Sequence, residues 1–206
     1  MSLEQEVKFA CSDFDRLRPI LEENKARFVH RVFEHNRVYD TPGRHLRAGG
    51  KLLRLREARQ AVLCLKQSPG DAKTPGHVSS QVKTWEETQT QVVDPGSMHS
   101  LLLSLGYEVV FAYQKVREKW QAGGCEVCLD RLPFGRYVEI EGEPDRIWAQ
   151  ARTLGLSPQE WSGKSYFDLH QQWRAANRLP PEESFVFGPE EEAAIRAEVE
   201  KGAESR

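Results

Sequence analysis

Charged side chains recur at every second position in several segments of the sequence, and this spacing could gather them on one surface. Near the N-terminus, Glu4, Glu6 and Lys8 alternate with largely apolar residues. Because successive side chains of a β-strand point to opposite faces, these three residues would share a face. Carboxylates bind hard divalent cations and an ammonium group binds anions, so this face could bind a phosphate together with a metal ion.

The same alternation of charged and apolar residues returns in later segments. The positions that would share the charged faces are Arg54, Arg56, Lys66, Lys115, Arg117, Lys119, Asp130, Glu139 and Glu141. For any one strand, a half-exposed sheet with a charged outer face explains the pattern better. Three features of the whole set favour an inward face instead. Charges follow one another without the usual Ser and Thr, arginine is frequent and its planar fork suits phosphate oxygens, and acids nearly balance bases.

An inward-facing charged surface needs a ligand. Isolated buried charges lose several kcal/mol of hydration, so the enclosed space would hold water and an ion that pairs with them. Several cations in fixed positions suit a polyanion, but neighbouring carboxylates would repel it unless a cation lies between them. Mg²⁺ or Mn²⁺ takes oxygen ligands and bridges carboxylates to phosphates. The residues therefore predict a polyphosphate bound together with Mg²⁺ or Mn²⁺.

The elements that must position these residues are mostly strands. Alternation predicts strands over about 3–9, 28–39, 51–57, 61–67, 78–92, 107–120, 125–131 and 136–142. Helices are predicted from a cap at Ser12 toward Asn24, at 95–105 after the cap Asp94, from Pro144 to near Gly155, and at 165–176. Many strands with few helices indicate an α+β fold, and the charged faces favour an antiparallel β-barrel flanked by helices.

The bulk composition sets the limits of the fold and of the partners. The 206 residues predict one domain over 1–178, followed by a linker and an acidic helix or tail over 179–206. A net charge of −2 gives no indication of a nucleic-acid partner, and no apolar run is long enough for a membrane span. The N-terminus does not resemble a signal peptide, so we expect a cytoplasmic monomer or homodimer. We expect the five tryptophans to pack helices onto the outside of the barrel.

The charged segments also resemble, in order, the motifs of the CYTH superfamily of triphosphate tunnel metalloenzymes. The matching segments are 4–8 (EQEVK), 51–56 (KLLRLR), 63–66 (LCLK), 115–119 (KVREK), 129–142 (LDRLPFGRYVEIEG) and 164–166 (KSY). The longest of these matches is 129–142. The resemblance covers about residues 3–174. It implies an eight-stranded antiparallel tunnel, flanked by helices, that binds a triphosphate.

The resemblance also implies roles for individual residues. Metal ligands would be Glu4, Glu6 and Glu141, with Glu139 beside them, and Asp130 or Glu139 could serve a second metal or the attacking water. The residues that would bind the phosphates are Lys8, Arg54, Arg56, Lys66, Arg117 and Lys119. The family also places a glutamate on the strand before the long helix; of Glu86 and Glu87, which lie on opposite faces, we prefer Glu86. Lys164 could cap one mouth of the tunnel.

These expectations favour metal-dependent hydrolysis of inorganic triphosphate, thiamine triphosphate or a nucleoside triphosphate. Hydrolysis needs only the triphosphate contacts that the sequence displays, and positioning and electrostatics would supply most of the acceleration. A class IV adenylate cyclase would use the same tunnel to make cyclic AMP and pyrophosphate from ATP. Two alternatives from other classes are a non-catalytic polyphosphate or nucleotide binder and a partner-binding domain with a charged outer face.

Overall fold

The chain folds around one antiparallel sheet, seen in a computed structural model that describes residues 2–70, 77–78 and 82–204. Its longer strands are β1 (Ser2–Ala10), β2 (Arg27–Asp40), β3 (Lys51–Glu57), β4 (Ala61–Gln67), β6 (Lys83–Val92), β7 (Glu108–Ala122), β8 (Cys125–Leu132) and β9 (Gly135–Glu141). The short strands β5 (His77–Val78) and β10 (Trp161–Ser162) extend it. The predicted strand over 78–92 is thus observed as β6 with the short β5 before it. The segment 70–76, whose glycines and Pro75 predict a flexible loop between strands, lies almost wholly outside the described residues.

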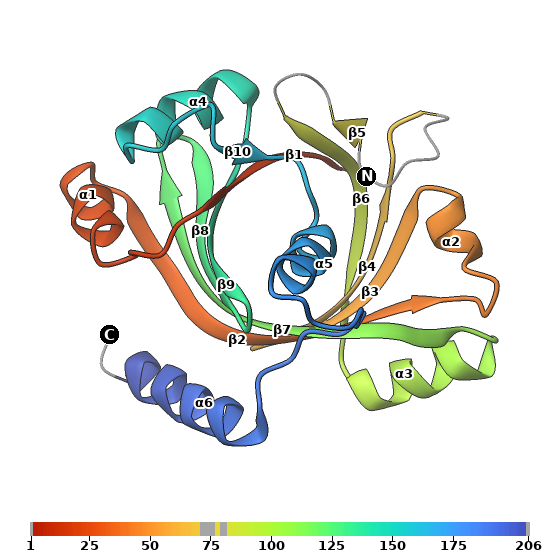
Figure 1. Cartoon of the computed structure of the whole chain (residues 1–206). Coiled ribbons are helices and arrows are strands. Elements are labelled where there is room, and N and C mark those ends of the chain that lie inside the picture. Colours follow the sequence, from red (N-terminus) through yellow and green to blue (C-terminus); the bar gives the residue numbers. More distant parts are fainter. Residues whose placement is uncertain (1, 71–76, 79–81, 205–206) are drawn as a thin grey trace.

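Eight of these strands close into a ring (Figure 1). The order β1-β9-β8-β7-β2-β3-β4-β6 returns to its start because β6 also pairs with β1, with Glu4 opposite Trp85. Closure gives each of the eight strands a partner on both sides over at least part of its length, and gives every strand an inner and an outer face. The predicted α+β class and the eight-stranded antiparallel tunnel with flanking helices are confirmed.

Six helices are described: α1 (Leu17–Glu23), α2 (His45–Ala48), α3 (Pro95–Ser104), α4 (Pro144–Thr153), α5 (Tyr166–Ala176) and α6 (Pro189–Glu204). Asp94 caps α3 as predicted, accepting hydrogen bonds from the backbone N–H groups of Gly96 and Ser97. The cap predicted at Ser12 is wrong, because α1 begins at Leu17. That start places Pro19 in the first turn, where a missing N–H costs no helical hydrogen bond.

The apolar faces of the strands point outward and are covered by helices. The largest core cluster joins strand residues such as Val7, Val127 and Ile140 to Leu21 of α1 and Ile147 of α4. A second cluster packs Tyr39 and Leu55 against Leu102 of α3. Because side chains alternate along each strand, burying the apolar face under helices turns the charged face into the ring.

Helix α5 lies across the ring and fills one end of it (Figure 1). Its N-terminus carries a capping box, in which the Ser165 hydroxyl accepts from the Asp168 backbone N–H and the Asp168 carboxylate accepts from the Ser165 backbone N–H. Tyr166 of this helix belongs to an aromatic cluster with Tyr113 and Phe134. The ring is therefore apolar at this end and charged beyond it.

The C-terminal segment packs onto the outside of the ring. Phe187, which precedes α6, and Ile195 of α6 are buried against Phe33 and Val116, and Phe185 enters the aromatic cluster. The domain boundary predicted at residue 178 stays a prediction, but the segment beyond it is not a loose tail. In the described part of the chain, no helix combines the length and apolar character needed to cross a bilayer.

Candidate functional site

The charged inner faces of the ring line one cavity, here called the tunnel cavity, of about 230 Å³. Its charged lining residues are Glu4, Glu6, Lys8, Arg54, Arg56, Lys66, Lys83, Glu87, Lys115, Arg117, Lys119, Glu126, Glu139 and Glu141. These are eight bases and six acids, so the lining carries an excess of two positive charges. Such an excess inside an enclosed space favours a polyanion.

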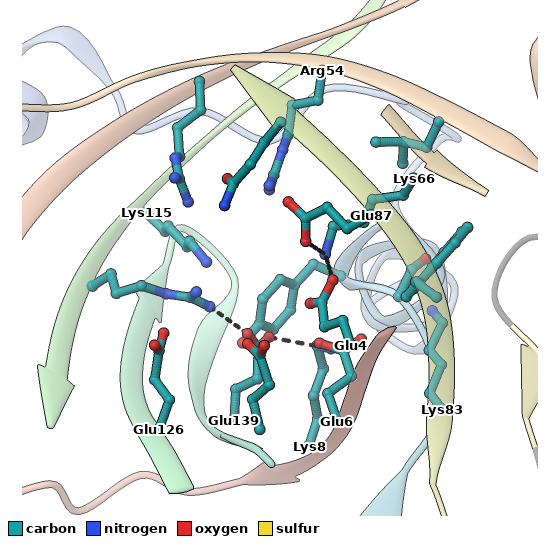
Figure 2. A pocket seen from close by; sticks show the side chains of 18 of the residues that line it. Glu4, Glu6, Lys8, Arg54, Lys66, Lys83, Glu87, Lys115, Glu126 and Glu139 are labelled. Carbon is teal, nitrogen blue, oxygen red and sulfur yellow. Dashed lines mark hydrogen bonds and ion pairs between the residues drawn. The ribbon is translucent and has the colours of Figure 1, made fainter. Parts of the chain in front are cut away.

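The acids gather where β1 and β9 run side by side. Glu6 lies opposite Glu141 in the strand register, and Lys8 lies opposite Glu139. The Lys8 ammonium group bridges two of these acids, at 2.6 Å from Glu6 Oε1 and 3.1 Å from Glu139 Oε2. Lys66 of β4 pairs with Glu4 of β1 over the intervening strand β6. Figure 2 shows Glu4, Glu6 and Glu139 pointing into the same space, with Arg54 and Lys115 on the far side.

The arginines of the tunnel are held by side chains behind them. Asp130 is fully buried and accepts from Arg117, with Nε at 2.8 Å and a terminal nitrogen at 2.6 Å, and from Lys115 at 3.1 Å. The Tyr113 hydroxyl accepts from a terminal nitrogen of Arg54 at 2.9 Å. Among the described atoms, the buried Nε of Arg54 has no acceptor. Such an unpaired buried donor is what a bound phosphate oxygen would satisfy.

Burial and like charges make two acids hard to ionise. Burial raises the pKa of Glu4 to about 8, with Glu6 and Glu141 adding to the effect while Lys66 opposes it. Burial, Glu126 and Glu139 raise the pKa of Glu141 to about 7. By contrast, burial opposes the ionised form of Glu139, but Arg117 and Lys8 outweigh it and hold the pKa of Glu139 well below its usual value.

These acids fit a hard divalent cation. They offer only carboxylate oxygens, which Mg²⁺ and Mn²⁺ prefer, and a cation bound beside Glu4 and Glu141 would favour the ionised forms that burial and neighbouring acids oppose. Within the described residues, no three acidic, histidine or cysteine side chains are already arranged around an ion position. The ammonium groups of Lys8 and Lys66 lie on the carboxylates instead, so a metal ion would have to displace them.

Ten of the site residues predicted from the sequence line the tunnel cavity together: Glu4, Glu6, Lys8, Arg54, Arg56, Lys66, Arg117, Lys119, Glu139 and Glu141. Asp130 is not in the lining but lies behind it, against Arg117 and Lys115. Its placement suits a residue that positions bases better than a metal ligand. The roles of all eleven residues stay predictions.

Two predicted residues lie away from the tunnel cavity. Glu86 accepts a hydrogen bond from Gln67 at 2.9 Å and does not line the cavity, whereas Glu87 does. The preference for Glu86 is therefore wrong, because β6 turns its odd-numbered residues inward. Lys164 is exposed and is likewise absent from the lining. It precedes α5 in a loop, so strand alternation does not direct it into the ring.

Sequence reasoning also missed several lining residues. Glu126 could have been found by extending the alternation of its strand, since it shares a face with Asp130, whereas Lys115 was placed on a charged face but was given no role in binding. Tyr166 gave no such signal; its hydroxyl donates to Asp130 at 2.7 Å, and Lys8 and Lys115 lie over its ring. Trp85 lines the tunnel, so its predicted place on the outer face is wrong.

A second cavity of about 220 Å³, here called the side cavity, shares Leu52, Lys83, Trp85 and Ser165 with the tunnel lining. Phe111 and Phe167 form part of its wall, with ring centroids 5.1 Å apart. The guanidinium of Arg47 lies 4.9 Å from the centre of the Phe167 ring. The side cavity therefore joins the charged tunnel to an aromatic surface edged by cations.

An eight-stranded ring with facing acidic and basic rows defines the class of the triphosphate tunnel proteins. The chain matches the model of the CYTH domain over residues 2–151, and it belongs to the CYTH family. A relative from Methanocaldococcus jannaschii, with the name "putative adenylate cyclase", is 21% identical in an alignment of 178 residues that covers 81% of this chain and 98% of the relative.

Solved structures share the fold. A Vibrio parahaemolyticus protein, described as a "putative adenylate cyclase", superposes with a TM-score of 0.69 at 24% identity, over 82% of this chain and 98% of that one. A Hippeastrum protein aligns with a TM-score of 0.58 at 20% identity, over 87% of this chain and 98% of that one. It is described as a "putative adenylyl cyclase" that reveals a dominant triphosphatase activity. The two descriptions show that neighbouring structures carry both activity names.

Proposed function

We propose that this chain hydrolyses a triphosphate in its tunnel with the help of Mg²⁺ or Mn²⁺. The observation that carries the proposal is that one cavity brings together bases, most of them on β3, β4 and β7, and carboxylates, most of them on β1, β8 and β9. A simple anion binder has no use for buried acids that repel its ligand, whereas a metal-dependent enzyme needs both. Membership in the CYTH family and the triphosphatase activity described for the Hippeastrum protein support the same reaction.

The residues divide the work by charge. Arg54, Arg56 and Arg117 would bind phosphate oxygens, since guanidinium groups match them in a bidentate manner. Glu4, Glu6 and Glu141 would hold the metal ion, with Glu139 beside them. Such an ion would supply positive charge that offsets the negative charge of the phosphates. The excess of positive charge in the lining stabilises charge that builds up on the phosphates in the transition state.

The chemical step itself asks little of the protein. A water oxygen forms a bond to the terminal phosphorus, the bond from that phosphorus to the bridging oxygen breaks, and a carboxylate of the acidic side takes the proton of the water. The shortened phosphate chain leaves with the bridging oxygen. In phosphoryl transfer of this kind, alignment and electrostatic stabilisation supply most of the rate enhancement.

The side cavity supports a second candidate, an adenylate cyclase. Its aromatic wall, formed in part by Trp85, Phe111 and Phe167, could receive a base or another flat organic group attached to the triphosphate. In a cyclase, the ribose hydroxyl replaces water as the attacking group and pyrophosphate leaves. We place hydrolysis first because it needs no positioned ribose.

A substrate panel separates the two reactions. The chain is incubated with inorganic triphosphate, thiamine triphosphate and ATP in Mg²⁺ or Mn²⁺, and orthophosphate, pyrophosphate and cyclic AMP are measured separately. We expect orthophosphate from at least one substrate and no cyclic AMP. Pyrophosphate and cyclic AMP from ATP, without orthophosphate, would make the chain a cyclase. Tight binding with no turnover in either metal would make it a binder.

A further inference from the structure

The segment after α5 adds a strand-like connection to the edge of β7. Strand β8 pairs with β7 only from Val116 onward, so the part of β7 before Val116 has no partner on that side within the ring. Phe185 takes this edge: its N–H donates to the Ala112 carbonyl at 3.0 Å, and its carbonyl accepts from the Gln114 N–H at 3.0 Å. The segment thereby satisfies backbone groups that a bare edge would leave open.

Further contacts hold this segment, here called the C-terminal strap (residues 182–199), in place. The side chain of Gln114 accepts from the Phe187 N–H at 2.9 Å and donates to Glu192 at 2.8 Å. On α6, Glu198 pairs with Arg31 of β2 at 2.9 Å. The strap is thus fixed by backbone pairing, a buried amide and an ion pair.

Phe185 connects the strap to the tunnel. Its ring stacks on Tyr113, with centroids 5.0 Å apart and planes inclined by 24°, and it meets Phe134 edge-on at 5.3 Å. Tyr113 projects from β7 on the inner face, and its hydroxyl accepts the hydrogen bond from Arg54. Phe185 of the strap therefore packs against Tyr113, and Tyr113 in turn holds Arg54 of the tunnel in place.

We propose that Phe185 and Tyr113 are positioning residues for triphosphate binding, and that the C-terminal strap is a working part of the tunnel. The stack holds the Tyr113 ring, the Tyr113 hydroxyl orients one terminal nitrogen of Arg54, and Nε of Arg54 is left free for a phosphate oxygen. Preorganising a guanidinium lowers the cost of binding an anion. The inference rests on the proposed triphosphate ligand, but not on its hydrolysis.

The strap offers a matched control for the test. Phe185 and Phe187 are two residues apart and each is 3% exposed, yet Phe187 packs outside the ring against Phe33. Both Phe185→Ala and Phe187→Ala should lower the melting temperature by opening a cavity. Only Phe185→Ala should weaken binding of non-hydrolysable imidotriphosphate in Mg²⁺, measured by calorimetry at a temperature where both variants are folded. We expect about a tenfold higher Kd for Phe185→Ala and less than about a twofold change for Phe187→Ala.

A double-mutant cycle tests the connection through Tyr113. If Phe185 acts through the tyrosine hydroxyl, Phe185→Ala should add little to the Kd of a Tyr113→Phe variant. The proposal would be overturned if Phe185→Ala and Phe187→Ala lost affinity equally, or if Phe185→Ala kept full affinity. Additive effects of Phe185→Ala and Tyr113→Phe on the Kd would overturn it as well. If the wild-type chain binds imidotriphosphate but hydrolyses no triphosphate, the proposed hydrolysis is refuted. The double-mutant cycle can still be interpreted in that case, because it measures binding alone.

Discussion

At the scale of single residues, the tunnel holds acids whose proton affinity depends on the charge around them. Glu4 and Glu141, with pKa values raised to about 8 and about 7, sit beside other carboxylates in a buried corner. A divalent cation bound there would favour their ionised forms, and protons would compete with it. Metal binding and protonation at this corner are therefore opposed.

Metal affinity should rise with pH. We expect the gain in melting temperature on adding Mn²⁺ to be small at pH 6 and to grow up to about pH 9, because Glu141 and Glu4 lose their protons between about pH 7 and 8. Without metal, the contribution of these two groups to folding stability changes with pH in the opposite direction. The folded state binds their protons more tightly than the unfolded state, so their contribution to stability falls as pH rises from 4.5 to about 8. Glu141→Gln should flatten the metal response, and a response that is equal at pH 6 and pH 9 would contradict this assignment.

Trp85 should distinguish organic from inorganic substrates. It lies where the tunnel meets the side cavity, so Trp85→Ala should raise the Kd of an aromatic triphosphate ester by about three- to tenfold through lost stacking. Inorganic triphosphate should bind with less than about a twofold change. Trp161→Ala is the matched control, because that indole packs on Trp148 outside the ring. Equal losses for both ligands in Trp85→Ala would place the organic group elsewhere.

The sequence predicted which residues share a face better than which face points inward. In β1 and β9 an apolar face marks the outside, and the charged partners were located correctly. In β6 this signal is missing, because Trp85 shares the inner face with Glu87 while Thr84, Glu86 and Thr88 form a polar outer face. With polar residues on both sides of the strand, alternation alone could not separate Glu86 from Glu87.

At the scale of elements, α5 connects helix capping to the chemistry of the tunnel. Its first residue, Tyr166, donates to Asp130, which in turn holds Lys115 and Arg117. The capping box at Ser165 fixes the start of the helix and hence the place of that tyrosine. A local signal, the spacing of Ser165 and Asp168, thus determines a contact between residues far apart in the chain.

Removing this cap should loosen both the helix and the site. Ser165→Ala should cost about 1 kcal/mol of unfolding free energy, and lower the melting temperature by roughly 2–4 °C, by leaving the Asp168 N–H without its acceptor. It should also weaken triphosphate binding, because Tyr166 and Asp130 would be held less firmly. Ser100→Ala in α3, where the hydroxyl only donates to a backbone carbonyl, should change neither quantity measurably. A Ser165→Ala variant as stable as the wild type would refute the role of the cap.

The predicted strands were nearly right in position, but the contacts between elements were not predictable. Alternation and turn residues are local, so they locate β7 and the capped start of α3 within a few residues. The strap is different: its segment is rich in Glu and Ala, and only Phe185, Phe187 and Ile195 enter the protein interior. The place where those three side chains pack depends on an edge of β7 that β8 leaves unpaired, because β8 is shorter than β7. This difference becomes visible only in the strand pairing of the structure.

At the scale of the whole molecule, ring closure forces acids and bases into one small space. These acids and bases neutralise each other: Lys8 bridges Glu6 and Glu139, and Lys66 bridges Glu4 and Glu87. A polyanion must compete with these carboxylates for the lysines, and a metal ion must compete with the lysines for the carboxylates. A bound polyanion therefore frees carboxylates for the metal ion, and a bound metal ion frees lysines for the polyanion.

Metal and triphosphate should consequently bind with positive cooperativity. We expect saturating Mn²⁺ to lower the Kd of imidotriphosphate by about tenfold or more, after correction for the metal–ligand complex in solution, and imidotriphosphate to lower the Kd of Mn²⁺ by the same factor, as linkage requires. Calorimetric titrations in both orders measure the two factors. In Lys8→Met the ammonium bridge between Glu6 and Glu139 is absent, so Mn²⁺ alone should bind more tightly and the coupling should shrink. Independent binding of the two ligands to the wild type would mean that the acidic and basic sides of the tunnel do not act on a common ligand.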